Sequence, residues 1–162
     1  MTTSEPLIIT REFDAPKEIV WKAMTDTEIM KRWWGPETFT APIIRSDFRV
    51  GGKYHFCMRS PEGKDYWSTG EYKEIIPFKK IVNTDSFADA DGNVISASEY
   101  GMGSDWPDAL LVTFDFEETD GKTTMSAKQE GIPSPEMFEE SRKGWDQSFD
   151  KLEKVIEEIK ND

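Results

Sequence analysis

The sequence predicts a single α+β domain in which a long C-terminal helix covers a curved antiparallel sheet of about six or seven strands. From Ile43 to Gln129 the apolar residues alternate with a period of two, and turn dipeptides separate the runs. Before this region the pattern fits one strand and two short helices, and after it a helical spacing returns. A chain of 162 residues suits one domain over residues 1–162, with its core from about 7 to 160.

The N-terminal segment begins with a predicted strand from Leu7 to Phe13. Asp14-Ala15-Pro16 then places a capping residue before a proline, which the first turn of a helix tolerates. One apolar helix face follows, made by Ile19, Val20, Ala23 and Met24. Thr25-Asp26-Thr27-Glu28 offers a capping box for a second short helix, which Gly35-Pro36 ends.

Turn signals divide the central region into the strands of an antiparallel meander; they are Gly51-Gly52, Glu62-Gly63, Asp91-Gly92 and Asp120-Gly121. In the segment from Lys53 to Arg59, one face carries Tyr54, Phe56 and Met58, and the other carries His55 and Cys57. A matching apolar stripe on a later strand consists of Leu110, Val112, Phe114 and Phe116. We expect the stripes to form the concave, covered face of the sheet.

Two further segments complete the layout. Residues 88–107 contain glycine and proline with little periodicity, so we interpret them as a long loop or lid. The last segment is predicted to be one long amphipathic helix, with an apolar stripe of Phe138, Trp145, Phe149, Leu152, Ile156 and Ile159. Gly144 interrupts this helix at a cost of about 1 kcal/mol relative to alanine. Close approach to the sheet, room for a ligand or a tolerated surface position would each account for it.

Charge and composition exclude several classes of function. The formal net charge of −12 repels phosphate backbones and anionic membranes, so we expect no nucleic-acid partner. No stretch reaches the roughly 18 apolar residues of a membrane span, and the N-terminus lacks the pattern of a signal peptide. With one cysteine, Cys57, no intrachain disulfide can form. We therefore expect a cytoplasmic protein that is a monomer or a weak homodimer.

Large aromatic side chains are the most informative composition signal, because the chain holds six Trp and ten Phe. A ring-rich set around a curved sheet suits a cavity for a hydrophobic ligand, although each ring taken singly also suits an ordinary core. The predicted ligand-binding residues are Trp33, Trp34, Tyr54, Phe56, Met58, Trp67, Phe87, Val112, Phe114, Met137, Trp145 and Phe149.

Motifs for metal, cofactor or catalytic sites are weak. His55 and Cys57 give two metal ligands at most, whereas a zinc site uses three or four from the protein. Residues 89–93 resemble the start of a calcium loop, but the glycine falls at the wrong position, which favours an Asp-Gly turn. Gly51-Gly52-Lys53 lacks the Ser or Thr of a phosphate loop. We therefore predict no metal, no cofactor and no assigned catalytic residue.

An ordered series of short motifs resembles a known family. It consists of Asp14-Ala15-Pro16 with Val20-Trp21, the run from Lys31 to Pro36, the run from Asp47 to Gly52, Tyr54-His55-Phe56, Gly70-Glu71-Tyr72, and Gly144-Trp145 with Leu152. From about Leu7 to Ile159 the chain is similar to the activator-of-heat-shock-protein-ATPase-like domains of the START-like (SRPBCC) superfamily, including its stand-alone microbial members. The resemblance implies a helix-grip fold with an apolar cavity, and relatives that bind lipids, hormones or polyketides, a minority of which catalyse.

Three functional hypotheses follow from these observations. The first is a noncatalytic module that binds a small hydrophobic or aromatic molecule in the cavity. The second is a stress-related, co-chaperone-like protein that contacts a chaperone or a client through its acidic surface. The third is a cavity enzyme of the cyclase or hydrolase type that uses acids or tyrosines as its catalytic groups. Two or more buried acids with shifted pKa values inside the cavity would support it.

Overall fold

The computed structural model describes residues 6–100, 107, 109–132 and 135–161. Within these residues the strands form one antiparallel sheet in the order β1-β7-β6-β5-β4-β3-β2. The strands are β1 (Leu7–Phe13), β2 (Thr40–Ser46), β3 (Lys53–Arg59), β4 (Asp65–Ile76), β5 (Lys80–Ala88), β6 (Leu110–Thr119) and β7 (Lys122–Glu130). The helices are α1 (Lys17–Thr25), α2 (Thr27–Met30), the 3-10 helix η1 (Ala97–Tyr100) and α3 (Pro135–Lys160).

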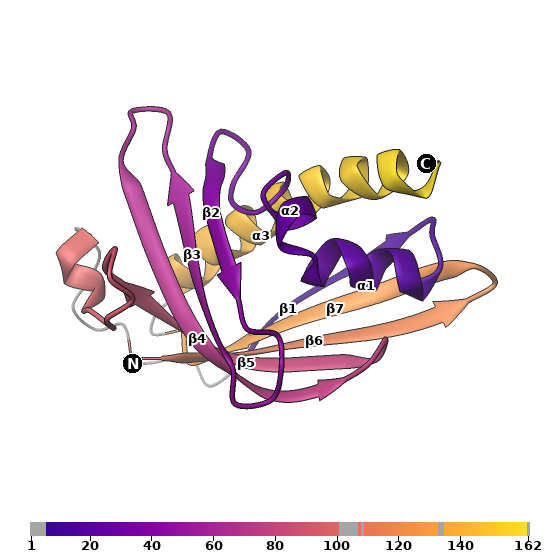
Figure 1. Cartoon of the computed structure of the whole chain (residues 1–162), viewed down its shortest axis with the longest axis horizontal. Helices are drawn as coiled ribbons and strands as arrows, with labels where there is room; N and C mark the ends of the chain where they lie inside the picture. The colour runs from indigo at the N-terminus through magenta and orange to yellow at the C-terminus, as the bar shows by residue number, and fades with distance from the viewer. Residues whose placement is uncertain (1–5, 101–106, 108, 133–134, 162) are drawn as a thin grey trace.

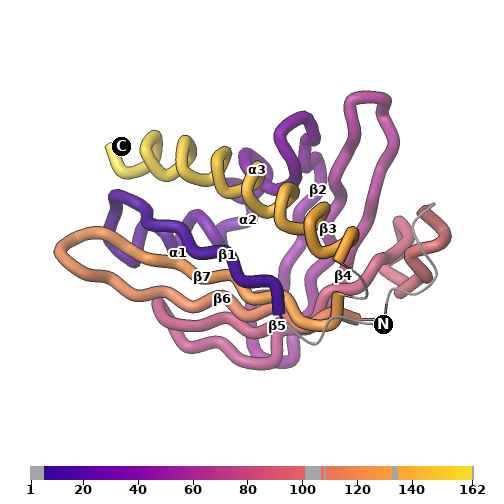
Figure 2. The backbone as a smooth tube through the Cα atoms, turned by 180° about the vertical axis from the view of Figure 1, so that it is seen from behind, coloured from indigo at the N-terminus to yellow at the C-terminus, as the bar shows by residue number. Residues whose placement is uncertain are grey.

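The sheet is curled into a half-barrel, which confirms the predicted helix-grip α+β fold (Figure 1). Strands β2 to β7 each pair with the next strand in the chain, as a meander requires, and β1 joins the free edge of β7. The β6–β7 turn has positive φ at both Asp120 and Gly121, the geometry that favours an Asp-Gly hairpin. Seen from behind, α3 runs across the open side of this half-barrel (Figure 2).

Two short N-terminal helices are present as predicted, but α2 ends at Met30, before the predicted stop at Gly35-Pro36, and the caps of both helices differ from the prediction. The residue before α1 is Pro16, with no side-chain cap, and the Asp14 carboxylate instead accepts a hydrogen bond from Lys160. Asp26 caps α2 by accepting hydrogen bonds from the backbone N–H groups of residues 28 and 29. The Thr25 hydroxyl bonds back to the preceding turn, so the capping box is replaced by a single aspartate cap.

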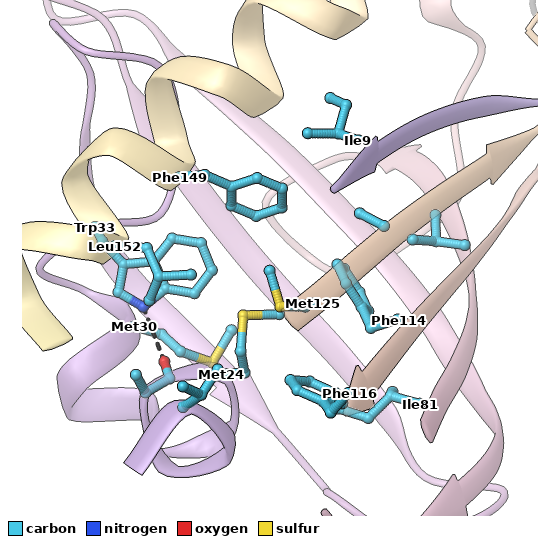
Figure 3. Packing of buried hydrophobic residues seen from close by; sticks show 14 of the residues in the cluster. Ile9, Met24, Met30, Trp33, Ile81, Phe114, Phe116, Met125, Phe149 and Leu152 are labelled. Atoms are coloured by element: carbon cyan, nitrogen blue, oxygen red, sulfur yellow. Dashed lines mark hydrogen bonds between the residues drawn. The ribbon is translucent and has the colours of Figure 1, made fainter. Parts of the chain in front are cut away.

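The C-terminal half of α3 closes a densely packed core. Phe149, Leu152, Val155 and Ile156 are buried there against the sheet and the N-terminal helices. Figure 3 shows Phe149 and Leu152 above Met125, with Trp33 and Met30 beside them. The Trp33 indole donates a hydrogen bond of 2.8 Å to the carbonyl oxygen of Ala23, so even this fully buried polar group has a partner. This end of the molecule is filled by side chains.

The predicted long loop contains local structure in its described part. Asp89 accepts backbone hydrogen bonds from residues 91 and 93, which confirms the predicted Asp-Gly turn. An isolated bridge joins Ala88 to Val94, and η1 follows. Residues 101–106 of this segment lie outside the described part, so its interpretation as a lid stays a prediction. None of the helices in the described ranges is long and apolar enough to cross a membrane.

Candidate functional site

A crevice opens between the sheet and the N-terminal half of α3, and its innermost part reaches the core residues Met24, Met30 and Ile81. It consists of three adjoining spaces among the described residues, with volumes of about 40, 210 and 450 Å³. We call them the inner, middle and outer pockets. The middle and outer pockets share Met58, Phe87 and Gln129, and Asp85 lies on the wall of all three. The cavity predicted from the sequence is therefore present, with Asp85 at its base.

The wall of the crevice opposite the sheet comes from α3 and from the loop between α2 and β2. Ser141, Gly144 and Trp145 face the middle pocket from α3. The loop is fastened to the same helix by Lys151, whose ammonium group donates hydrogen bonds of 3.1 Å to the carbonyl oxygens of Pro36 and Phe39. Burial lowers the pKa of Lys151, as expected for an ammonium group withdrawn from water.

Aromatic rings make most of the apolar wall around the inner pocket. Trp34 packs edge-on against Phe56, with ring centres 5.0 Å apart, and against Trp145 at 6.1 Å. Trp145 also contacts Phe114 on β6 at 5.8 Å. The Trp145 indole donates a hydrogen bond of 3.1 Å to the side-chain oxygen of Gln129 on β7, which fixes the ring against the sheet. The expectation that Trp145 faces the sheet is confirmed.

The structure distributes the predicted ligand-binding residues between the crevice and its surroundings. Those that lie on the walls of the pockets are Trp34, Tyr54, Phe56, Met58, Phe87, Val112, Phe114, Met137 and Trp145. Trp33 and Phe149 are instead fully buried in the packed core and line none of the three spaces. Trp67 borders the middle pocket, but its ring stacks on His55, on the opposite face of the sheet.

His55 and Cys57 belong to this opposite face, as their alternation with Tyr54 and Phe56 predicted. The His55 ring lies 4.4 Å from the ring of Trp67, and its Nε2 atom lies 3.0 Å from the carbonyl oxygen of Asp89. Cys57 is fully buried, and this burial raises the pKa of its thiol to about 11. A thiol that stays protonated is a poor nucleophile, so the pair acts in packing.

A polar cluster at the base of the crevice was missed by the sequence reasoning. The Tyr54 hydroxyl lies 2.8 Å from both the carbonyl oxygen of Thr84 and Oδ1 of Asp85. The Asn83 amide donates to the same Thr84 oxygen at 2.9 Å and approaches the Tyr54 hydroxyl at 3.4 Å. The Tyr54 hydroxyl has a single proton to donate, so the three side chains form a coupled network.

This network depends on a glycine in the strand between its members. Gly70 on β4 stands opposite Tyr54 on β3, and the register of Thr69 and Tyr72 with β5 places it opposite Asp85. A Cβ atom at this position would lie 1.9 Å from the carbonyl oxygen of Thr84 and 2.5 Å from the Tyr54 ring. Gly70 therefore allows the Tyr54 ring to cross β4 and reach Asp85.

Burial controls the ionisation of the cluster. It raises the pKa of Asp85 from the ordinary value of 3.8 to about 6, against the lowering effect of the hydrogen bond from Tyr54. Burial, followed by the nearby charge of Asp85, raises the pKa of Tyr54 well above its ordinary value. At neutral pH the cluster therefore holds a neutral phenol beside a carboxylate that is mostly ionised but poorly hydrated.

Side chains at alternate positions of β5 face the crevice, and this alternation could have identified the polar cluster from the sequence. Asn83 and Asp85 occupy alternate positions with Phe87 on β5, and Phe87 was among the predicted ligand-binding residues. On β7, Gln129 likewise lies on the same face of the strand as Met125. Selecting apolar residues alone discarded these polar members of the same stripe.

Gly144 is open on the side that faces the α2–β2 loop. A Cβ atom built there would meet only Cγ of Pro36, at 4.0 Å. The explanation by close approach to the sheet is therefore wrong. Because Gly144 borders the middle pocket, room at the crevice wall is what the structure favours.

The acids at the crevice bear on the enzymatic hypothesis. The acids among the described wall residues are Asp85, which is half-buried, and Glu140, which is exposed at the rim of the outer pocket. A hydrolytic or cyclising site needs two or more convergent groups, each able to hold or transfer a proton. Within the described walls Asp85 therefore has no second acid withdrawn from water beside it, and its partner at 2.8 Å is the Tyr54 hydroxyl.

Comparisons with known proteins agree with this fold. The family model described as Activator of Hsp90 ATPase homolog 1-like protein matches residues 14–157. A protein of Chromobacterium violaceum is 28% identical, with 96% of this chain and 99% of that one covered and a TM-score of 0.79. A protein of Nitrosomonas europaea is 20% identical over 100% of both chains, with a TM-score of 0.80. The AHSA1 protein of Silicibacter pomeroyi is 23% identical, with 91% of this chain and 94% of that one covered and a TM-score of 0.72. Among curated proteins none matches the sequence significantly.

Proposed function

We propose that this chain, which belongs to the Activator of Hsp90 ATPase homolog 1-like family, binds a small hydrophobic or aromatic molecule in the crevice between its sheet and α3. The crevice itself is the observation that carries the proposal. Ligand pockets are largely apolar, have a few fixed polar groups, and are commonly about 300 to 1,000 Å³ in volume. The outer pocket alone measures about 450 Å³, and aromatic walls with one polar cluster at the base meet the other two criteria.

The contrast between the two halves of α3 supports the same function. Protein interiors are normally packed as densely as organic crystals, and the core under Leu152 and Ile156 follows this rule. Under Ser141 and Trp145 the same helix stands off the sheet and leaves space. A ring-lined space at one end of an otherwise filled core has a cost in stability, which binding a ligand would offset.

The test combines a search for a natural ligand with a probe of the crevice. Native mass spectrometry and solvent extraction of the purified protein would identify any copurifying compound. N-Phenyl-1-naphthylamine, a neutral apolar fluorophore, would report binding in solution through a saturable rise in fluorescence. We expect saturation at one site and displacement of the probe by the extracted compound.

Two variants on α3 form a matched pair for this test. Ser141→Trp places a large ring at a position that borders both the middle and outer pockets. Lys143→Trp places the same ring two residues away, on the exposed side of the helix. We expect Ser141→Trp to abolish probe binding and Lys143→Trp to keep it. Equal binding by both variants, or no saturable binding by the wild type, would refute the proposed function.

A further inference from the structure

We propose that the ligand is a hydrophobic amine: an apolar or aromatic body that carries one protonated amino group, which pairs with the carboxylate of Asp85. This inference rests on the proposed binding function and specifies the class of molecule that the crevice accepts. It is supported by the charge of the walls, the hydrogen-bonding state of Asp85 and the rings around it.

The walls of the crevice carry charge of one sign. Asp85 lies at the base and Glu140 at the rim, and no Lys, Arg or His is found among the described residues lining the three pockets. A ligand carboxylate or phosphate would meet like charge and find no cation to pair with. The net charge of −12 on the chain adds a potential that attracts cations. The crevice therefore disfavours anionic lipids and favours cationic ligands.

Asp85 keeps hydrogen-bonding capacity on the side of the crevice. Its Oδ1 atom lies 2.8 Å from the Tyr54 hydroxyl. Its Oδ2 atom accepts no hydrogen bond from the described residues, although an ionised carboxylate offers about four lone-pair positions. An ammonium group carries three N–H donors and a positive charge, so it supplies both the hydrogen bond and the counter-charge that the protein does not.

The rings beside Asp85 suit a cation as well as an apolar body. Trp34, Tyr54, Phe56 and Trp145 line the inner pocket together with Asp85. Aromatic faces attract cations, and the attraction grows when water is excluded. The inner pocket, at about 40 Å³, exceeds the roughly 10 to 15 Å³ that a cavity needs to hold one water molecule. It therefore has room for an amino group, and the body of the ligand would occupy the middle and outer pockets.

The pH dependence of binding follows from the groups that face Asp85. These are Tyr54 on β3, Tyr66 and Tyr72 on β4, and Glu140 on α3, while β6 and β7 contribute residues that do not titrate. The pKa values of Tyr54 and Tyr72 are raised above the ordinary value of 10.0, so these two phenols stay neutral over the range tested. With the pKa of Asp85 at about 6, acidification to pH 5 protonates most of this carboxylate. An aliphatic amine, with a pKa of about 10, remains charged.

Three probes of nearly equal size separate the alternatives: 1-naphthylmethylamine, 1-naphthylmethanol and 1-naphthoic acid. Calorimetry at pH 7.5 would give the affinity of each for the whole protein. We expect the amine to bind about tenfold or more tightly than the alcohol, since hydrogen bonds to charged partners contribute roughly that factor. The acid should bind weakest. At pH 5 the affinity of the wild type for the amine should fall by up to about tenfold.

Asp85→Asn keeps the shape of the side chain and removes its charge. The matched control is Asp115→Asn, the same change at an exposed position of β6 that borders none of the three pockets. We expect the first variant to lose the preference for the amine, and with it the pH dependence, while its affinity for the alcohol is kept. The second variant should keep both. A wild type that binds the alcohol as tightly as the amine, or an Asp85→Asn variant that keeps the preference, would overturn the ligand class alone. Failure of all three probes to bind would count against the proposed function as well.

Discussion

Asp85→Asn should make the protein more stable at neutral pH, which is unusual for a change to a buried polar side chain. The substitution removes a charge that has no cationic partner among the described residues of the crevice wall, and it keeps an oxygen that can accept the Tyr54 hydrogen bond. Because desolvation of the charged form is the main cost at this site, an uncharged side chain of the same size should be tolerated better.

The pKa of Asp85 sets the size and the sign of the effect. One pKa unit corresponds to about 1.4 kcal/mol. A rise from 3.8 to about 6 therefore means that the charged Asp85 destabilises the folded wild type at neutral pH by at most about 3 kcal/mol. The folded protein binds this proton more tightly than the unfolded chain does. The stabilisation that this bound proton gives the wild type is therefore complete below about pH 4 and is lost as the pH rises from about 4 to 6. Because water reaches the carboxylate through the crevice, we expect about 1 to 2 kcal/mol.

Thermal and urea unfolding at pH 4 and pH 7.5 would measure this difference. At pH 7.5 the variant should melt about 2 to 8 °C above the wild type, and at pH 4 the two should melt together. Glu140→Gln, at the exposed rim of the same crevice, serves as the control and should match the wild type at both values. If Asp85→Asn melts at or below the wild type at pH 7.5, or if the gap is the same at pH 4, the account of a destabilising buried carboxylate is wrong.

Three further substitutions test the geometry of the crevice. Gly70→Ala should lower the free energy of unfolding by roughly 3 kcal/mol or more, because its Cβ atom would collide with the Thr84 carbonyl oxygen and the Tyr54 ring. Urea unfolding measures this loss, and unchanged stability would contradict the crossing of β4 by the Tyr54 ring. Gly144→Ala should stabilise the protein by up to about 1 kcal/mol, because alanine has the higher helix propensity and its Cβ atom would make only an ordinary contact with Pro36 at 4.0 Å. A lower melting temperature would contradict this. Trp145→Ala should lower the free energy of unfolding by about 3 kcal/mol, the lower end of the range for large aromatic side chains, because the ring partly faces the crevice. Probe titration should also show weaker binding to this variant, and unchanged binding would place the ligand elsewhere.

The fold was predictable from the sequence because each element carries a local signal that its environment reinforces. Leu110, Val112, Phe114 and Phe116 occupy alternate positions on β6, and the structure buries all four on the concave face. The cap of α2 was less predictable. Asp26 and Thr25 can both act as caps, and the choice depends on where α1 ends.

The site was only partly predictable, because aromatic residues suit both a cavity wall and a packed core. Trp33 and Trp34 are neighbours in the chain, yet the first is sealed in the core and the second borders the crevice. Their difference depends on how far α3 stands from the sheet, which no local pattern encodes. Asp85 was missed for a related reason, because an acid on a predicted strand is usually assigned to the solvent face.

Under the proposed function, the position of Asp85 sets stability and binding against each other in this crevice. A carboxylate at the base of an aromatic pocket has a cost at every pH above its pKa, and the protein contributes one phenol, from Tyr54, to offset that cost. An apolar residue in its place would stabilise the empty protein but would leave the crevice unable to distinguish an amine from an alcohol. A destabilising group that lies on the wall of all three pockets is better explained by recognition than by folding.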